Sequence, residues 1–246
     1  LRINNEERIT ANTVGGFTVP NYYSLAASKD RPTLTSFISN KKVRSVYAFG
    51  SIGFKNYLFL DLNIRNDWSS SLPKNNNSYL YGGGSLSFVF TDILPKSDFF
   101  SFGKATFAFG RTGSDIDPYN IYQVYNSAGF YGTQPSLTIP NEIPNESLKP
   151  ALSDALEAGV ELKFLKNRLR FNANYFDRTS KDQILSVTLP STTGFSSALI
   201  NAGEVSSSGF EFTLGGTPVK TNDFTWDLNA NFATNRNKIV ELYPGV

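Results

Sequence analysis

The segment that most constrains the fold is residues 160–175, where two runs of alternating apolar and polar residues flank Lys166-Asn167. Alternation with a period of two is the pattern of a β-strand that has one apolar and one polar face. A two-residue turn at Lys166-Asn167 pairs Phe164 with Leu169, so the apolar residues of both strands share one face. The opposite face carries charged and amide side chains, which a dry core does not accommodate. We therefore predict a β-hairpin with one face in hydrocarbon and the other in water.

The same two-sided pattern recurs along the chain and predicts about eight strands in all. Besides the hairpin, the predicted strands cover residues 43–54, 57–66, 80–90, 100–110, 210–214 and 224–232, with a short additional strand at 184–189. Residues 1–42 contain glycine and proline among polar residues, and we expect them to be mostly loop, with one strand around residues 17–19. The barrel strands and their loops are therefore expected to occupy residues 43–242, and residues 243–246 are not expected to form a terminal strand.

The connectors between these predicted strands alternate in length. Short connectors at 55–56, 166–167 and 217–223 alternate with long ones at 67–79, 111–153 and 179–204. An up-and-down meander with tight turns at one end and long loops at the other is typical of outer-membrane barrels, whereas a soluble β-sandwich has mostly short connections. We predict an all-β, antiparallel, up-and-down transmembrane β-barrel, with the soluble sandwich as the alternative.

Aromatic residues gather at the ends of the predicted strands, as the interfacial girdles of a membrane barrel require. The pairs are Phe54 with Tyr57, Phe99 with Phe100, and Phe224 with Trp226.

The polar faces of the strands indicate a wide barrel. An eight-stranded barrel has an interior that side chains fill, and the charged and amide residues here are too many for so narrow a lumen. The residues that we predict to face the lumen are Asp61, Asn63, Arg65, Glu161, Arg170 and Asn172. We therefore interpret the chain as a section of a larger, water-filled barrel.

The composition excludes several classes of function. The 246 residues include no Cys and no His, which removes disulfides, the usual zinc sites and the usual nucleophile–base pairs. A formal net charge of +2 gives no reason to expect a nucleic-acid partner. No apolar run approaches the roughly 20 residues of a membrane-spanning helix. We expect no catalytic residues and no cofactor, and we do not expect an enzyme.

A series of short motifs resembles one known family. In chain order they are RNDWSSSLPK (65–74), FGKATFAFGRTG (102–113), DIDPY (115–119), NESLK (145–149), NRLRFNANYF (167–176), TSKDQIL (179–185), TGF (193–195), NAGEV (201–205), GFEF (209–212), FTW (224–226) and NRNK (235–238). Together they are similar to the barrel of SusC/RagA-type TonB-linked outer-membrane transporters, and the resemblance covers residues 43 to 242. Gly82-Gly83-Gly84 departs from the family pattern, and glycine within a barrel strand indicates a bend or a close backbone approach.

The resemblance implies a 22-stranded barrel in the outer membrane of a Gram-negative bacterium, with an N-terminal plug inside it. It also implies a SusD-like surface lipoprotein as a lid and energy delivered by TonB. This chain would then be an interior fragment without the plug, the TonB-contacting segment or the closing strand, with its short turns in the periplasm and its long loops outside. The implied function is active import of an oligomeric nutrient, either a glycan or a peptide. A non-transporting adhesin or scaffold subunit and a passive porin remain the alternatives.

Five aromatic residues in the 111–150 insertion are the candidate substrate contacts. Exposed aromatic rings combine a large contact area with a polar group, and they stack on sugar rings or hold peptide side chains. The alternative is that they pack the loop against itself or against a lid. The residues are Tyr119, Tyr122, Tyr125, Phe130 and Tyr131.

The polar candidates likewise have two interpretations. The predicted lumen-facing residues either steer a polar solute or simply solvate the lumen and hold the plug. Asp115 and Asp117 in the DIDPY motif have the chemistry of calcium ligands, but an Asp pair before proline is more often a turn former, so we predict no metal site.

Overall fold

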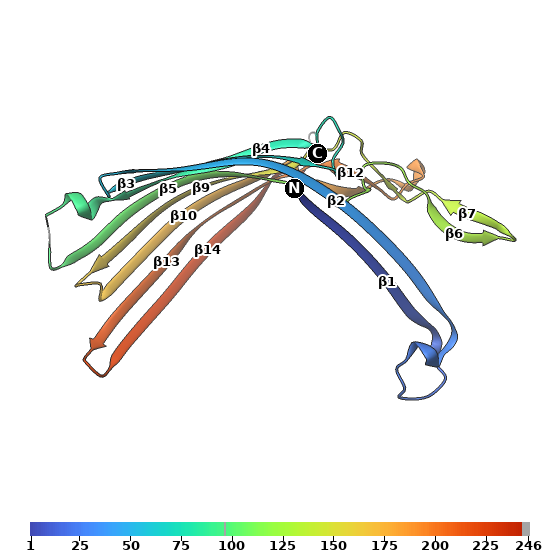
Figure 1. The fold of residues 1–246 in the computed structure, drawn as a ribbon, viewed down its shortest axis with the longest axis horizontal. Helices are drawn as coiled ribbons and strands as arrows, with labels where there is room; N and C mark the ends of the chain where they lie inside the picture. Colours follow the sequence, from blue (N-terminus) through green and yellow to red (C-terminus); the bar gives the residue numbers. More distant parts are fainter. Residues whose placement is uncertain (96, 243–246) are drawn as a thin grey trace.

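The structure, a computed structural model, describes residues 1–95 and 97–242. Within these ranges, nine strands form one antiparallel sheet that curves into an arch (Figure 1). In sheet order they are β1 (Arg2–Phe17), β2 (Ser28–Phe54), β3 (Leu58–Ser69), β4 (Ser78–Val89), β5 (Phe100–Ser114), β9 (Ala151–Phe164), β10 (Leu169–Lys181), β13 (Glu204–Lys220) and β14 (Thr225–Glu241). Residues 243–246, which we expected not to form a strand, lie outside the described residues.

Two smaller sheets lie in the long connections. β6 (Asn126–Tyr131) and β7 (Gln134–Thr138) form a projecting hairpin, and β11 (Ile184–Thr188), β12 (Ser197–Asn201) and β8 (Glu142–Ile143) form a three-stranded sheet. The helices within residues 1–95 and 97–242 are the short 3-10 segments η1 (Leu25–Ala27), η2 (Phe90–Ile93) and η3 (Ser191–Thr193). In the described part of the chain, no helix has the length and apolarity needed to cross a bilayer.

The predicted hairpin has the predicted register. Phe164 lies opposite Leu169, and the ladder continues in register through β9 and β10. At the turn, the backbone N–H of Arg168 donates to the carbonyl of Leu165 over 3.2 Å. Leu165, Lys166 and Asn167 have φ values of 54°, 55° and 70°. The strands end at Phe164 and Leu169, so the connection is a four-residue loop rather than the predicted two-residue turn. A second Lys-Asn pair, at 55–56, forms the β2–β3 turn with φ values of 47° and 62°.

The prediction that residues 1–42 are mostly loop is wrong. β1 pairs with the first half of β2 from Arg2 opposite Val43 to Phe17 opposite Ser28, which gives the sheet a ninth strand. Val43 also lies opposite Ser69, so β2 changes its partner from β1 to β3 at this residue. Residues 2–42, here called the β1–β2 arm, extend well away from the rest of the sheet (Figure 1). Polar residues occupy much of both faces of the arm, and its sequence therefore lacks apolar alternation.

The two ends of the sheet differ as the connector lengths predict. The β2–β3, β9–β10 and β13–β14 turns lie at one end, on the left of Figure 1, which we call the short-turn end. The β6–β7 hairpin and the three-stranded sheet lie at the other end, here called the long-loop end. The predicted short strand at 184–189 is confirmed as β11.

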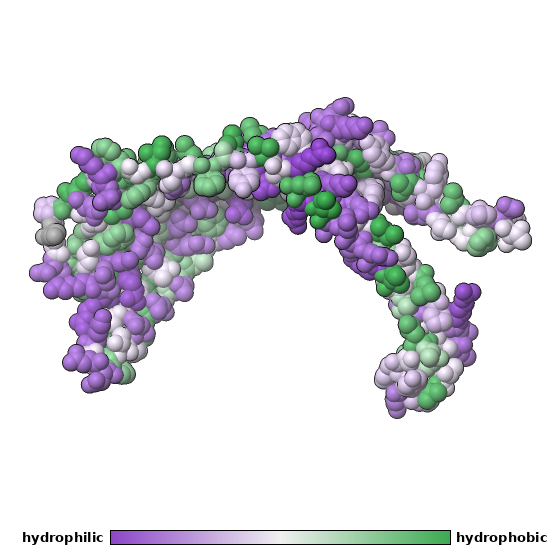
Figure 2. Space-filling model, in the orientation of Figure 1, coloured by the Kyte–Doolittle hydropathy of each residue, from purple (hydrophilic) through white to green (hydrophobic). Residues whose placement is uncertain are grey.

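The strands are two-sided. Residues directly opposed in an antiparallel ladder share a face, and Asp61 lies opposite Ser51 and Ser85, whereas Leu62 lies opposite Gly50 and Gly84. Leu62 is 50% exposed, so the apolar face of β3 is not covered by protein. Figure 2 shows hydrophobic residues along the convex outline of the sheet and hydrophilic residues beneath it. The sheet therefore has no dry core of its own.

Aromatic side chains form a continuous row on the apolar face at the short-turn end. Ring centroids are separated by 5.7 Å between Phe54 and Tyr57, 6.2 Å between Tyr57 and Phe88, 6.2 Å between Phe88 and Phe90, 5.9 Å between Phe90 and Phe100, and 5.4 Å between Phe100 and Phe164. A row of this kind along one rim is the arrangement of an interfacial girdle.

The glycine triplet in β4 marks a close backbone approach, as the sequence indicates. A Cβ atom on Gly83 would lie 2.4 Å from the carbonyl oxygen of Phe109, and one on Gly82 would lie 2.3 Å from that of Asn63. Both oxygens belong to the backbones of neighbouring strands, which side-chain rotation cannot move.

We predict that Gly83→Ala lowers the free energy of unfolding of the receptor by about 1–3 kcal/mol, because overpacking against backbone costs this much. Gly110 lies opposite Gly83 in the ladder, and a Cβ there meets no atom within 4 Å. Gly110→Ala is therefore the matched control, and it should unfold like the wild type. The temperature at which the folded barrel is lost on gel electrophoresis measures the difference, and equal values for both variants would contradict the prediction.

Candidate functional site

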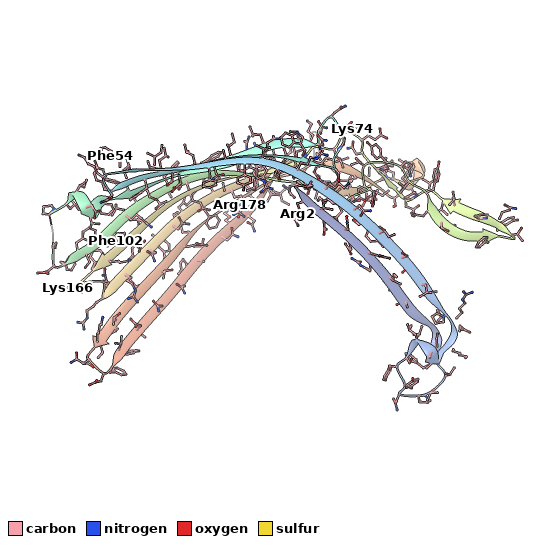
Figure 3. The ribbon with its side chains drawn as sticks, viewed as in Figure 1. Arg2, Phe54, Lys74, Phe102, Lys166 and Arg178 are labelled. Carbon is pink, nitrogen blue, oxygen red and sulfur yellow. The ribbon has the colours of Figure 1, made fainter. Side chains whose placement is uncertain are left out.

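The concave face has a cavity of about 520 Å³ near the long-loop end, here called the upper pocket. Strands β1 to β5 and the segment that follows β5 all contribute to it. Its polar and aromatic lining residues are Arg2, Asn4, Lys41, Arg65, Asp67, Tyr79, Tyr81, Ser114, Asp115 and Asp117. Figure 3 shows Phe54 and Lys166 at the opposite, short-turn end of the sheet.

A fixed carboxylate forms one wall of the upper pocket. Asp67 is 4% exposed, and one of its oxygens accepts from Arg65 Nε at 2.7 Å while the other accepts from the Tyr81 hydroxyl at 2.7 Å. The Arg65 guanidinium also lies 5.7 Å from the centre of the Tyr81 ring. The two-residue spacing of Arg65 and Asp67 puts both on the concave face of β3. This wall is therefore a rigid arrangement of one acid, one base and one aromatic ring.

A second carboxylate joins three segments at the base of the β1–β2 arm. Asp115 Oδ1 accepts from Lys41 Nζ at 2.6 Å. Its Oδ2 accepts from the hydroxyls of Ser69 and Ser71, which are each 1% exposed. Lys41 Nζ also donates to the carbonyl of Ile116 at 3.1 Å. Asp115 is thus occupied by an ion pair and by serine hydrogen bonds, which gives the DIDPY motif a structural role.

The two long insertions share a small apolar core. It contains Ile121, Leu148 and Leu199, and Leu148 is fully buried at 0% exposure. Beside it, Asn201 Nδ2 donates to the carbonyl of Lys149 at 2.8 Å, and Asn201 Oδ1 accepts from the Lys149 backbone N–H at 2.7 Å. The NESLK and NAGEV motifs therefore meet in space. They fix the long loops relative to the sheet beneath them.

The structure separates the five candidate aromatic residues. The hydroxyl of Tyr119 accepts from the backbone N–H of Asn40 at 3.1 Å, at the base of the arm. The remaining four lie in the following loop and on the β6–β7 hairpin, away from the upper pocket. Their exposed fractions are 50% for Tyr122, 63% for Tyr125, 75% for Phe130 and 87% for Tyr131. At least half of each of these four side chains is thus exposed, and their contact with a substrate, with a lid or with the loop itself stays a prediction.

The six predicted lumen-facing residues share the concave face, but they do not form one site. Asp61, Asn63 and Arg65 lie in β3. Glu161 lies in β9, and Arg170 and Asn172 lie in β10. Strands β4 and β5 lie between the two groups, and the register of the ladder places both groups on the same face. Their role in a lumen stays a prediction.

Most of their charges are paired. Glu161 contacts Lys163 at 2.9 Å and Lys104 at 3.3 Å, and Arg170 lies 3.6 Å from Asp227. The concave face is therefore polar without a strong excess of either sign.

Sequence reasoning missed the residues that complete the upper pocket. Asp67 stands two residues after Arg65 in the RNDWSSSLPK motif, and the period of two places both side chains on the same face of the strand. Tyr79 and Tyr81 follow the same rule at the start of β4. Arg2 and Lys41 had no such signal, because they lie in the segment that was expected to be loop.

The two-sided antiparallel sheet, with its aromatic rim and length-sorted connections, defines a section of a membrane β-barrel. The chain matches the family model described as "TonB dependent receptor-like, beta-barrel" over residues 5–243. It belongs to this family, and its sheet is part of an outer-membrane barrel. The family comprises transport proteins rather than enzymes.

Curated relatives match most of the chain. TonB-dependent receptor P3 of Formosa agariphila is 26% identical over 216 residues, which are 86% of this chain and 22% of the relative. TonB-dependent receptor SusC of Bacteroides thetaiotaomicron is 28% identical over 211 residues, which are 80% of this chain and 21% of SusC. The chain thus spans about a fifth of the length of these relatives.

Solved structures show the same fold. The RagAB peptide transporter superposes with a TM-score of 0.82 at 24% identity, covering 94% of this chain and 26% of that chain. The ferric enterobactin receptor PfeA of Pseudomonas aeruginosa, as a Q482A mutant, superposes with a TM-score of 0.55 at 19% identity, covering 94% of this chain and 32% of that chain.

We predict that Asp115→Asn loosens the base of the β1–β2 arm. The amide cannot form the ion pair with Lys41, and loss of a hydrogen-bonded charge contact costs about 1.5–3 kcal/mol. Backbone amides of Asn40 and Lys42 should exchange with solvent faster by roughly tenfold or more. Asp117→Asn is the control, because no side-chain ion pair of Asp117 exists among the described residues. Hydrogen exchange measures both variants, and unchanged protection in Asp115→Asn would contradict the assigned role.

Proposed function

We propose that this chain is the barrel section of a TonB-dependent importer that carries an oligomeric nutrient, a glycan or a peptide, across the outer membrane. The observation that carries the proposal is the polar concave face with a walled pocket at its long-loop end, beneath exposed aromatic loops. In the proposed orientation, the long-loop end faces the outside of the cell and the short-turn end faces the periplasm. The similarity to SusC, and to a transporter described as moving peptides, supports this assignment.

The concave face is suited to conduct a polar solute. Its acids and bases are largely neutralised by their neighbours, as the contacts of Glu161 and Arg170 show. A surface with hydrogen-bonding groups and little net charge forms hydrogen bonds with a polar solute, but it does not bind the solute as tightly as a strongly charged site would. Asp61, Asn63 and Asn172 add hydrogen-bonding capacity along the same face.

The exposed loop aromatics are proposed to meet the incoming nutrient or its carrier. Tyr122, Tyr125, Phe130 and Tyr131 present rings to solvent, and such rings bind sugar faces and peptide side chains. We propose a SusD-like surface lipoprotein as the partner that covers this end. TonB is proposed to supply energy through a plug domain.

Uptake of labelled oligosaccharides and oligopeptides by cells that produce the intact receptor tests the proposal. Uptake of one of the two classes should stop when the proton-motive force is collapsed and should require the surface lipoprotein. Uptake that persists without the proton-motive force would indicate a passive pore. Binding of the oligomer without any uptake would indicate an adhesin or scaffold.

In the same assay, the double variant Tyr122→Ala/Tyr125→Ala should weaken capture of the nutrient or of the lipoprotein roughly tenfold or more, since each stacked ring contributes about 1 kcal/mol. Tyr22→Ala is the control, because Tyr22 is also exposed, at 55%, but lies in the β1–β2 connection. Unchanged capture and unchanged uptake in the double variant would remove these two tyrosines from the proposed site.

A further inference from the structure

Three exposed basic residues lie on the convex side of the sheet, at the long-loop end (Figure 3). Lys42 and Arg44 lie in β2. Arg44 is directly opposite Trp68 of β3. Lys74 lies in the β3–β4 connection, and Figure 3 places it on the convex side. The Ser70 backbone N–H donates to the carbonyl of Lys42 at 2.9 Å, which fixes the connection beside β2. We call Lys42, Arg44, Lys74 and Trp68 the outer basic patch.

The patch begins where the apolar face of β2 ends. Below Arg44, the convex face of β2 carries Val46, Ala48, Gly50, Ile52 and Phe54. Phe54 belongs to the aromatic row and lies ten residues from Arg44, or about 33 Å along a strand. A strand tilted by about 40° rises about 25 Å over this length, which is the height of the apolar band of a membrane barrel. Arg44 is therefore level with the lipid headgroups.

The position of Trp68 also indicates that this part of the sheet lies at the level of the lipid headgroups. It is 39% exposed on the convex face beside Arg44. Tryptophan concentrates at the boundary between hydrocarbon and headgroups, because its ring is apolar and its N–H needs a polar partner. The aromatic row at one end and Trp68 at the other therefore enclose the apolar band of β2 and β3.

Among the described residues, no acidic side chain forms an ion pair with the patch. On the same convex rim, Arg111 is bound by Asp154 with contacts of 2.5 and 2.8 Å, and Lys181 lies 3.5 Å from Glu204. By contrast, the three basic side chains of the patch are exposed, and they form no ion pair with any residue that the structure describes. The rim thus has a local excess of positive charge. A ligand that complements this charge is an anion at the level of the lipid headgroups.

We propose that the outer basic patch binds the phosphate groups of an anionic lipid in the outer leaflet. An arginine guanidinium binds two phosphate oxygens at once, and lysine supplies a point charge. Trp68 packs against the lipid beside these contacts. This binding holds one rim of the barrel at a defined depth in the membrane. It uses the proposed orientation of the barrel but does not depend on transport.

Binding is measured with the intact receptor in phosphatidylcholine nanodiscs that contain diphosphoryl lipid A, by mass spectrometry of the lipid retained on purification. A basic side chain at an anionic lipid surface strengthens binding roughly fivefold. The triple variant Lys42→Ser/Arg44→Ser/Lys74→Ser should therefore weaken retention roughly a hundredfold. The triple variant Lys166→Ser/Arg168→Ser/Lys220→Ser, which removes the same charge at the short-turn end, should retain lipid A like the wild type.

Retention of lipid A by the first triple variant at the wild-type level would overturn the proposal. Equal retention of a dephosphorylated lipid A, or its displacement by inorganic phosphate at equimolar concentration, would also overturn it, because the patch would then not recognise a phosphorylated lipid. If the triple variant does not fold, Lys74→Ser alone, in the loop, should lose roughly fivefold. Uptake is not part of this readout, so failure here leaves the proposed transport function untouched.

Discussion

The requirement that a backbone in lipid satisfies every N–H and C=O group determines this structure. A strand meets the requirement only by pairing on both sides, and the pairing then leaves side chains as the sole variable on each face. The period of two sends Leu62 to the convex face and Asp61 to the concave face within one strand. Because neighbouring strands keep register, the assignment of apolar residues to one face and polar residues to the other is the same in each strand of the sheet. A lipid-facing and a water-facing surface follow from the same hydrogen bonds.

The long-loop end depends on a different principle, because water surrounds it. There the β1–β2 arm and the two insertions are held mainly by specific polar contacts, and the two insertions also share a small apolar core. Asp115 ties Lys41 to the end of β3, and Asn201 ties the second insertion to the first. Leu148 packs with Ile121 and Leu199 in a small core of these loops. The upper pocket forms between these fixed points, so its walls are rigid although loops contribute to them.

The sequence predicts the strands that cross the apolar band and misses the one that does not. Leu169, Phe171 and their neighbours alternate because lipid lies on one side, and that alternation is readable residue by residue. Thr10 and Thr35, paired in the arm, are both exposed polar residues, and polar residues on both faces of the arm leave its strands without such a signal. The upper pocket was only partly predictable for the same reason. Arg65 could be placed on a face, but its partner Tyr81 comes from a strand whose register depends on the fold.

The central claim is that adjacent residues of β3 face different solvents, and single-cysteine labelling tests it most directly. Since the chain has no cysteine, Leu62→Cys and Asn63→Cys can be compared in an intact receptor that is otherwise free of cysteine. A spin label at residue 62 should be broadened by oxygen dissolved in the lipid, and one at 63 by a water-soluble nickel complex. The reverse assignment, or equal response at both positions, would contradict the two-sided barrel.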